Sequence, residues 1–136
     1  MDHEARHDYL YTEVMTAAPQ KLQLMLIDAA IRLVHRAQNH WERNDDHTAS
    51  EALIRCQQVM SELLGGVDVQ SGNDLVRRVA SVYLFVYRSL VLANLERSRE
   101  KLADVLRVLE IERQTWADVC QQLGTEREAS TARMVS

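Results

Sequence analysis

Apolar residues surround almost the whole circumference of one long stretch, Leu75 to Leu95, which contains no glycine or proline. The stretch is too long for a strand, since strands usually end within about ten residues. Arg77, Arg78 and Arg88 interrupt it, whereas a membrane-spanning helix needs about 20 largely uncharged residues. The pattern therefore predicts a helix that is either buried on most sides or offers one side to a partner.

Three further stretches carry apolar residues at steps of three and four, which is the spacing of an amphipathic helix. Pro19 suits the first turn of the first stretch, and Gly65-Gly66 and Gly124 suit the ends of the second and the last. Thr48 with Glu51 resembles a capping box for the second. Together with the central stretch, these signals predict four helices, at about 19–43, 48–64, 74–96 and 98–123.

Helix caps and the chain ends complete the predicted architecture. Asn73 or Asp74 is the expected N-cap of the third helix, and Ser98 that of the fourth. Residues 1–15 are too short to form a stable helix alone, so they should dock on the body or move. Residues 124–136 are polar without periodicity and are predicted to be a flexible tail. The expected fold is all-α: an antiparallel four-helix bundle in one domain over 1–123, with a short N-terminal capping segment.

Composition narrows the range of functions. The 136 residues are 46% hydrophobic with four glycines and one proline, which favours long helices and short turns. A net charge of −4 argues against sequence-independent binding to nucleic acid or to an anionic membrane. The first residues lack the pattern of a signal peptide, so we expect a cytoplasmic protein. Cys56 and Cys120 occupy helix-seam positions and are expected to be reduced, buried thiols.

Catalytic and metal-binding patterns are weak. His3-Glu4-Ala5-Arg6-His7 matches the H-E-x-x-H motif of zinc proteases, but it lies at the extreme N-terminus with no third ligand at matching spacing. A di-iron bundle needs two Glu-x-x-His pairs, and Glu4 with His7 is the only one. Asp28, in an apolar part of the first helix, is expected to be a hydrogen-bonded or edge carboxylate. We therefore expect no enzymatic activity, no metal and no cofactor.

A series of short motifs keeps its order along the chain. Val14 to Leu22 has the form Val-x-Thr-Ala-x-Pro-x-x-Leu, and Met25 to Ala30 follows as Met-Leu-Ile-Asp-Ala-Ala. This order resembles the flagellar export chaperones of the FliS family, in which a tyrosine such as Tyr11 precedes these two segments. The likeness continues in register over roughly residues 9 to 123, at Val67-Asp68, Gly72, Tyr83, Tyr87-Arg88, Leu90, Ala93-Asn94-Leu95, Arg113 and Trp116.

The resemblance implies a helical bundle that binds the disordered C-terminal region of flagellin and prevents its polymerisation before type III secretion. It also implies that the N-terminal segment covers a client groove when no client is bound. We expect helix-in-groove recognition. The candidate groove consists of Ile27, Ile31, Tyr83, Leu84, Tyr87 and Leu92. Arg88 and Asn94 are expected to satisfy polar groups of the client, and the candidate cover consists of Tyr9, Tyr11 and Val14.

The chain departs from the family pattern at several positions. Ile27 replaces a tyrosine, Ala29 and Asn73 replace glycines, and Leu84 and Leu92 stand where many relatives carry acidic residues. A co-chaperone, an export-gate protein and a second copy of the chain are further candidate partners. The alternative interpretation is a helical-bundle adaptor or oligomerisation module for another helical client, which would use the same exposed leucines.

Overall fold

The computed structural model describes residues 19–68, 70 and 72–135 of the chain. These residues form α2 (Pro19–Glu42), α3 (Asp46–Gly65), α4 (Asp74–Glu96) and α5 (Arg99–Val135), and the described ranges contain no strand. The expected all-α fold is confirmed. The predicted N-terminal cover (Tyr9, Tyr11 and Val14) and the His3–His7 motif lie outside the described residues.

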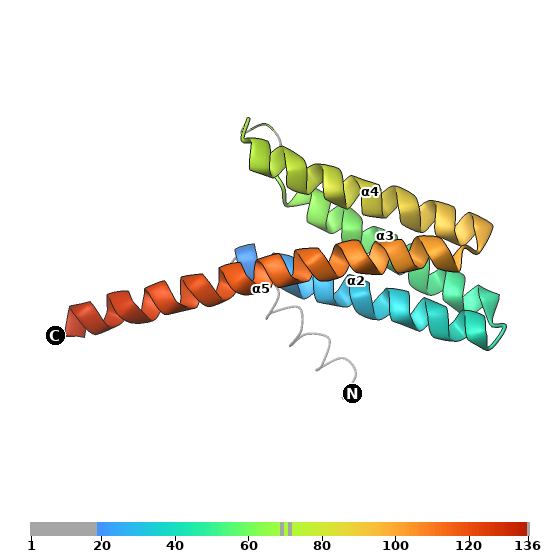
Figure 1. The fold of residues 1–136 in the computed structure, drawn as a ribbon, viewed down its shortest axis with the longest axis horizontal. Helices are drawn as coiled ribbons and strands as arrows, with labels where there is room; N and C mark the ends of the chain where they lie inside the picture. The colour runs from blue at the N-terminus through green and yellow to red at the C-terminus, as the bar shows by residue number, and fades with distance from the viewer. Residues whose placement is uncertain (1–18, 69, 71, 136) are drawn as a thin grey trace, which may run out of the picture.

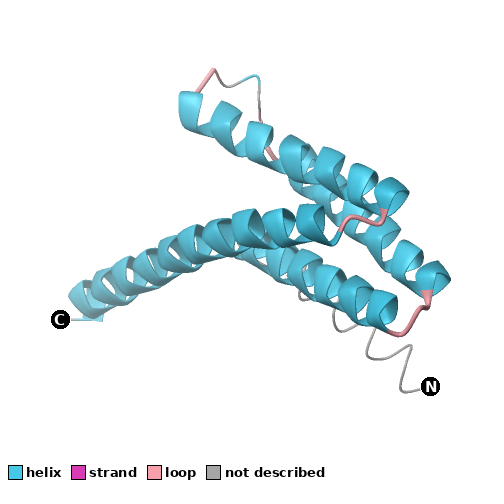
Figure 2. Ribbon diagram, turned by 45° about the vertical axis from the view of Figure 1, so that its right-hand side comes forward, coloured by secondary structure: helices cyan, strands magenta, loops and turns pink. Residues whose placement is uncertain are grey.

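The four helices form a closed ring of neighbours. Helix α2 packs against α3 and α5, and α4 packs against the same two helices, so α2 and α4 occupy opposite corners of the bundle. The α2–α3 and α4–α5 connections are short, as antiparallel neighbours require. The last part of α5 continues past the other helices towards the C-terminus (Figure 1) and diverges from α4 (Figure 2).

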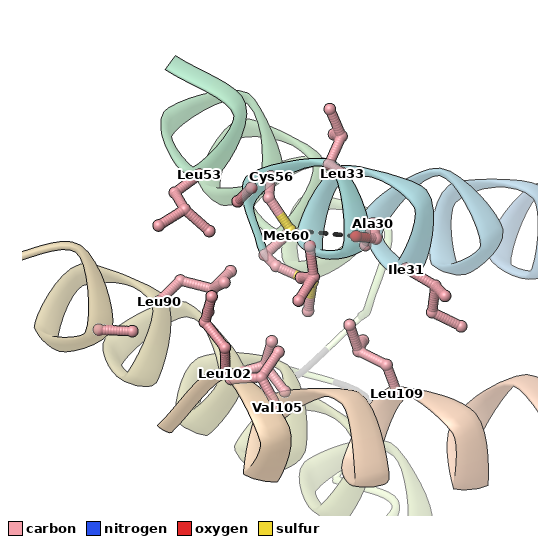
Figure 3. Close-up of a cluster of buried hydrophobic side chains, with 14 of the residues drawn as sticks. Ala30, Ile31, Leu33, Leu53, Cys56, Met60, Leu90, Leu102, Val105 and Leu109 are labelled. Carbon is pink, nitrogen blue, oxygen red and sulfur yellow. Dashed lines mark hydrogen bonds between the residues drawn. The ribbon is translucent and has the colours of Figure 1, made fainter. Parts of the chain in front are cut away.

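The core is built from the apolar stripes that the sequence pattern predicted. Figure 3 shows side chains of α3 (Leu53 and Met60), α4 (Leu90) and α5 (Leu102 and Leu109) meeting between the helices. All five are fully buried. Burying a leucine-sized side chain contributes about 1.5–3 kcal/mol, so this cluster is a main source of stability.

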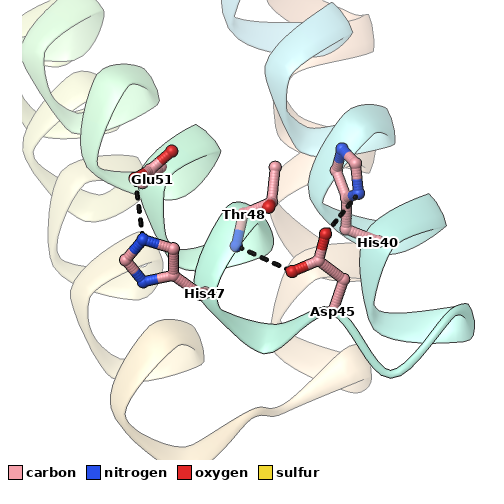
Figure 4. Close-up of polar contacts among 5 residues, drawn as sticks. All are labelled: His40, Asp45, His47, Thr48 and Glu51. Carbon is pink, nitrogen blue, oxygen red and sulfur yellow. Dashed lines mark hydrogen bonds and ion pairs between the residues drawn. The ribbon is translucent and has the colours of Figure 1, made fainter.

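The start of α3 differs from the predicted capping box. The helix begins at Asp46, and its N-cap is Asp45, whose Oδ1 accepts a hydrogen bond of 3.2 Å from the Thr48 backbone N–H. Figure 4 shows this contact beside the pairs His40–Asp45 and His47–Glu51. Thr48 is therefore the third residue of the helix rather than its cap. Asp45 takes this role because it directly precedes the first helical residue. There its carboxylate can accept hydrogen bonds from the first-turn N–H groups that have no partner within the helix.

Asp45→Asn should leave α3 capped at neutral pH while reducing the loss of stability in acid. Hydrogen bonds from the side chain and backbone of Thr48 lower the pKa of Asp45. The stabilisation is thus present above the unfolded-state pKa and is lost as the pH falls through the lower folded-state pKa. Urea unfolding across acidic pH should show a smaller decline for the asparagine variant than for the wild type. Equal declines would show that protonation of the Asp45 carboxylate does not contribute to the loss of stability in acid.

Polar side chains cap the start of α4 and the start of α5. The Asn73 side chain accepts a 2.8 Å hydrogen bond from the Leu75 N–H, and Ser98 Oγ accepts one of 3.1 Å from Lys101 at the start of α5. The caps expected at Asn73 and Ser98 are confirmed. The break after α4, which no glycine or proline marks, is made by Arg97 in the left-handed conformation with φ 50°.

Helix α5 does not end where Gly124 suggested. It continues to Val135, and the side chains of residues 121–134 are exposed. A glycine inside a helix costs about 1 kcal/mol relative to alanine, which can weaken a helix without ending it. The predicted helix end was therefore wrong, because a propensity penalty was interpreted as a stop signal.

Candidate functional site

Besides Leu75 near its N-terminal end, four large apolar side chains of α4 face solvent. They are Leu84, Phe85, Leu92 and Leu95, which are 39%, 52%, 43% and 77% exposed. Leu92 lies eight residues from Leu84, seven from Phe85 and three from Leu95, so the four side chains are on one side of the helix. We call this set the α4 outer stripe. Exposed apolar side chains are common singly, but a line of them on one helix is typical of a binding face.

The structure divides the predicted groove residues into two groups. Leu84, Leu92 and Arg88 are exposed, with Arg88 one helical turn from each leucine, and Tyr87 is half-buried at the edge of the core. Ile27, Ile31 and Tyr83 are instead buried in the core, so they offer almost no surface to a partner.

Three further residues of α4 change the outline of the predicted site. Asn94 is half-buried and lines a cavity with Trp41 and Arg97, and Leu95 of the outer stripe borders the same cavity. Phe85 and Leu95 belong to the stripe although the sequence interpretation did not select them. Their spacing from Leu92, seven and three residues, is the signal that could have identified them.

Tyr83 is buried because it joins three helices through hydrogen bonds. Its hydroxyl donates to Gln23 Oε1 of α2 at 2.6 Å and accepts from Trp116 Nε1–H of α5 at 3.1 Å. Burial raises the pKa of the Tyr83 phenol. A Cβ on Gly66 would lie 3.3 Å from Gln23 Nε2, so the glycine leaves room for this amide. The network is therefore structural, and Gln23 is its unpredicted member.

Tyr83→Phe should destabilise the bundle by about 1–3 kcal/mol, because it leaves the nearly buried amide oxygen of Gln23 without its donor. Combining it with Gln23→Leu should recover part of this loss, because both polar partners are then removed. Urea unfolding of the two single variants and the double variant measures the coupling. Strictly additive losses would show that the two residues do not act as a pair.

An apolar cavity of about 220 Å³ adjoins this network at one end of the bundle. It lies among the start of α2, the end of α3, the start of α4 and Trp116 of α5, and Val67, Leu75 and Val79 line it. Leu75 is largely exposed at this end. The cavity is large enough for one apolar side chain, and none of the four residues of the α4 outer stripe lines it.

The described residues offer little for catalysis. They contain no group of three histidine, cysteine, aspartate or glutamate residues placed to hold a metal ion. Asp28 accepts a 2.6 Å ion-paired hydrogen bond from Arg113 Nε–H, so it joins α2 to α5 as the expected bonded carboxylate. Burial raises the pKa of Cys56 to about 12, and its thiol donates to the Ala30 carbonyl. Cys120, expected to be buried, is only half-buried.

None of the described helices combines the length and apolarity needed to traverse a bilayer.

Comparison with known proteins decides the family. The family model described as "Flagellar protein FliS" matches residues 1–123. The chain belongs to the FliS family. It is 28% identical over 122 residues to the flagellar secretion chaperone FliS of Bacillus subtilis, covering 90% of each chain. The Salmonella typhimurium chaperone is 27% identical, covering 78% of this chain and 79% of its own.

A third FliS relative supports the same conclusion. The flagellar secretion chaperone of Campylobacter jejuni is 24% identical over 85% of this chain and 90% of its own. FliS family membership and the three relatives support a flagellar export chaperone and indicate a protein that is not an enzyme. The predicted family is thereby confirmed.

Proposed function

We propose that this protein binds the disordered C-terminal region of flagellin in the cytoplasm and prevents its polymerisation before type III secretion. The α4 outer stripe is the observation that carries the proposal, because it leaves four large apolar side chains between 39% and 77% exposed on one side of a helix. The FliS match supports a flagellar partner, since the relatives are flagellar secretion chaperones.

The proposed mechanism is helix-in-groove recognition. A disordered client segment loses conformational entropy on binding, and burial of apolar anchors at i, i+3 and i+4 compensates for this loss. Leu84 and Leu92, two turns apart, would contact successive anchors. Arg88 lies between them and makes no ion pair with another described residue, so its guanidinium is available to client carbonyl or carboxylate groups.

The N-terminal cover belongs to the same proposal. Pro19, where the described chain begins, lines the apolar cavity at the end of the bundle. If Tyr9, Tyr11 and Val14 compete with the client, deleting residues 1–15 should increase flagellin affinity severalfold in calorimetric titration. Weaker binding after the deletion would indicate that these residues assist the client instead.

A polymerisation assay tests the proposed function. Monomeric flagellin of the same organism would be seeded with filament fragments, with and without an equimolar amount of this protein, and the filaments collected by centrifugation. We expect flagellin to stay in the supernatant when the protein is present. Flagellin that lacks its C-terminal region should not bind, and this serves as the control. Unchanged pelleting in the presence of the folded protein would contradict the proposal.

Self-association through the α4 outer stripe is the competing function, because a second copy of the chain could bury the same leucines. The two functions differ in concentration dependence. Light scattering over a dilution series should show a monomer that becomes a one-to-one complex when the flagellin segment is added. A dimer that persists on dilution and excludes the flagellin segment would favour the oligomerisation module.

A further inference from the structure

A surface distinct from the α4 outer stripe and from the apolar cavity lies between α2 and α3. It is a cleft of about 320 Å³ with an apolar floor that includes Leu33 and Val59. Arg32 and Arg36 of α2 and Arg55 of α3 line it, and all three are exposed. Figure 3 shows Leu33 pointing away from Leu102 and Leu109 of α5, so this leucine serves the outer cleft rather than the centre of the core.

The three arginines have no ion-pair partner among the described residues. Some other cations of the bundle are paired, among them Arg97 with Asp46 at 2.7 Å, Lys101 with Glu96 at 2.9 Å and Arg113 with Asp28 at 2.6 Å. Glu62 is the only acidic residue that lines the cleft, so its lining carries a net charge of +2. This positive cluster occurs on a chain whose net charge is −4.

We propose that this cleft binds an acidic helical segment of a partner protein. Arg32 and Arg36 are one turn apart on α2, and two carboxylates at i and i+4 of a partner helix have the same separation. Each guanidinium can bind a carboxylate through two parallel hydrogen bonds. The apolar floor would receive a small apolar side chain between the two carboxylates.

The chemistry favours a short acidic peptide over nucleic acid. A nucleic acid carries phosphates along its whole length, and the negative net charge of the chain opposes such a polyanion outside the cleft. None of the residues that line the cleft belongs to α4. A partner bound here would therefore leave the α4 outer stripe accessible, so this inference does not depend on the flagellin proposal.

The test uses the full chain and a synthetic alanine-based helical peptide with two glutamates spaced four residues apart. The control peptide carries glutamine at both positions. Nuclear magnetic resonance of the arginine Nε–Hε groups would follow the titration. We expect saturable shifts at Arg32, Arg36 and Arg55, and at least tenfold weaker binding of the glutamine peptide.

Two double variants, each of which removes two positive charges, distinguish binding at the cleft from a general effect of net charge. Arg32→Gln with Arg36→Gln should reduce glutamate-peptide affinity at least tenfold, whereas Arg127→Gln with Arg133→Gln, on the exposed end of α5, should leave it unchanged. Both should retain the helical circular dichroism spectrum and flagellin-segment binding. Equal losses in the two double variants, equal affinity for the two peptides, or tighter binding of a DNA oligonucleotide at the same salt concentration would each overturn the proposal.

Discussion

Replacing Leu84 and Leu92 together by glutamate should weaken binding of the flagellin C-terminal segment by at least about 100-fold while leaving the bundle folded. Each leucine is expected to contribute about 1.5 kcal/mol or more when a client covers it, and a factor of ten in affinity corresponds to about 1.4 kcal/mol. Glutamate would remove this burial and place a charge against the apolar client. Both side chains are already partly in water, so the free protein should tolerate the change.

Leu123→Glu is the matched control for this experiment. Leu123 is 41% exposed, close to Leu84 and Leu92, but it lies on α5 beyond Trp116 rather than on the α4 outer stripe. Its substitution should change flagellin affinity less than threefold. If Leu123→Glu weakened binding as much as the α4 double variant, binding would depend on general surface hydrophobicity, and the assignment of the client face would be wrong.

The second large effect is on stability, and it compares two leucines that are two residues apart on α4. Leu90→Ala should reduce the free energy of unfolding by about 2–5 kcal/mol, because it opens a cavity in the core. Leu92→Ala should reduce it by less than about 1 kcal/mol, because this side chain is already partly solvated and its removal opens no cavity in the core. The residue type and the helix are the same, so only burial differs, at 0% against 43% exposure.

Urea unfolding followed by circular dichroism measures both free energies, and titration with the flagellin segment measures both affinities. Leu90→Ala should retain client affinity wherever it remains folded, whereas Leu92→Ala should lose affinity but not stability. Similar losses of stability in the two variants would show that Leu92 packs within the bundle and is not available to a client.

Most of the fold follows from periodicity and caps. Apolar residues at steps of three and four predicted four helices, because an amphipathic helix must bury one face. The predictions of the α3 N-cap and of the end of α5 were wrong because a local sequence signal competed with a stronger signal nearby. Asp45 caps α3 ahead of Thr48, since two residues of similar capping preference stood within one turn. Gly124 suggested an end to α5, but its helical neighbours continue through it.

The candidate site was less predictable than the fold. Helical spacing alone does not indicate which side of an all-apolar helix faces its neighbours. Leu84 and Tyr83 were therefore both predicted to line the groove, although one is exposed and the other is buried. The structure separates them because Tyr83 finds Gln23 and Trp116, which are 60 and 33 residues away in the chain. Such long-range partners depend on the relative placement of the helices, which the sequence pattern does not encode.

Calorimetric titration of the full protein with the C-terminal segment of flagellin from the same organism tests the central claim most directly. We expect one-to-one binding with a dissociation constant at micromolar level or below and a negative change in heat capacity, because apolar surface is buried and the client becomes ordered. Absence of binding, with the helical bundle intact by circular dichroism, would contradict the claim and leave a FliS-family bundle that serves another client.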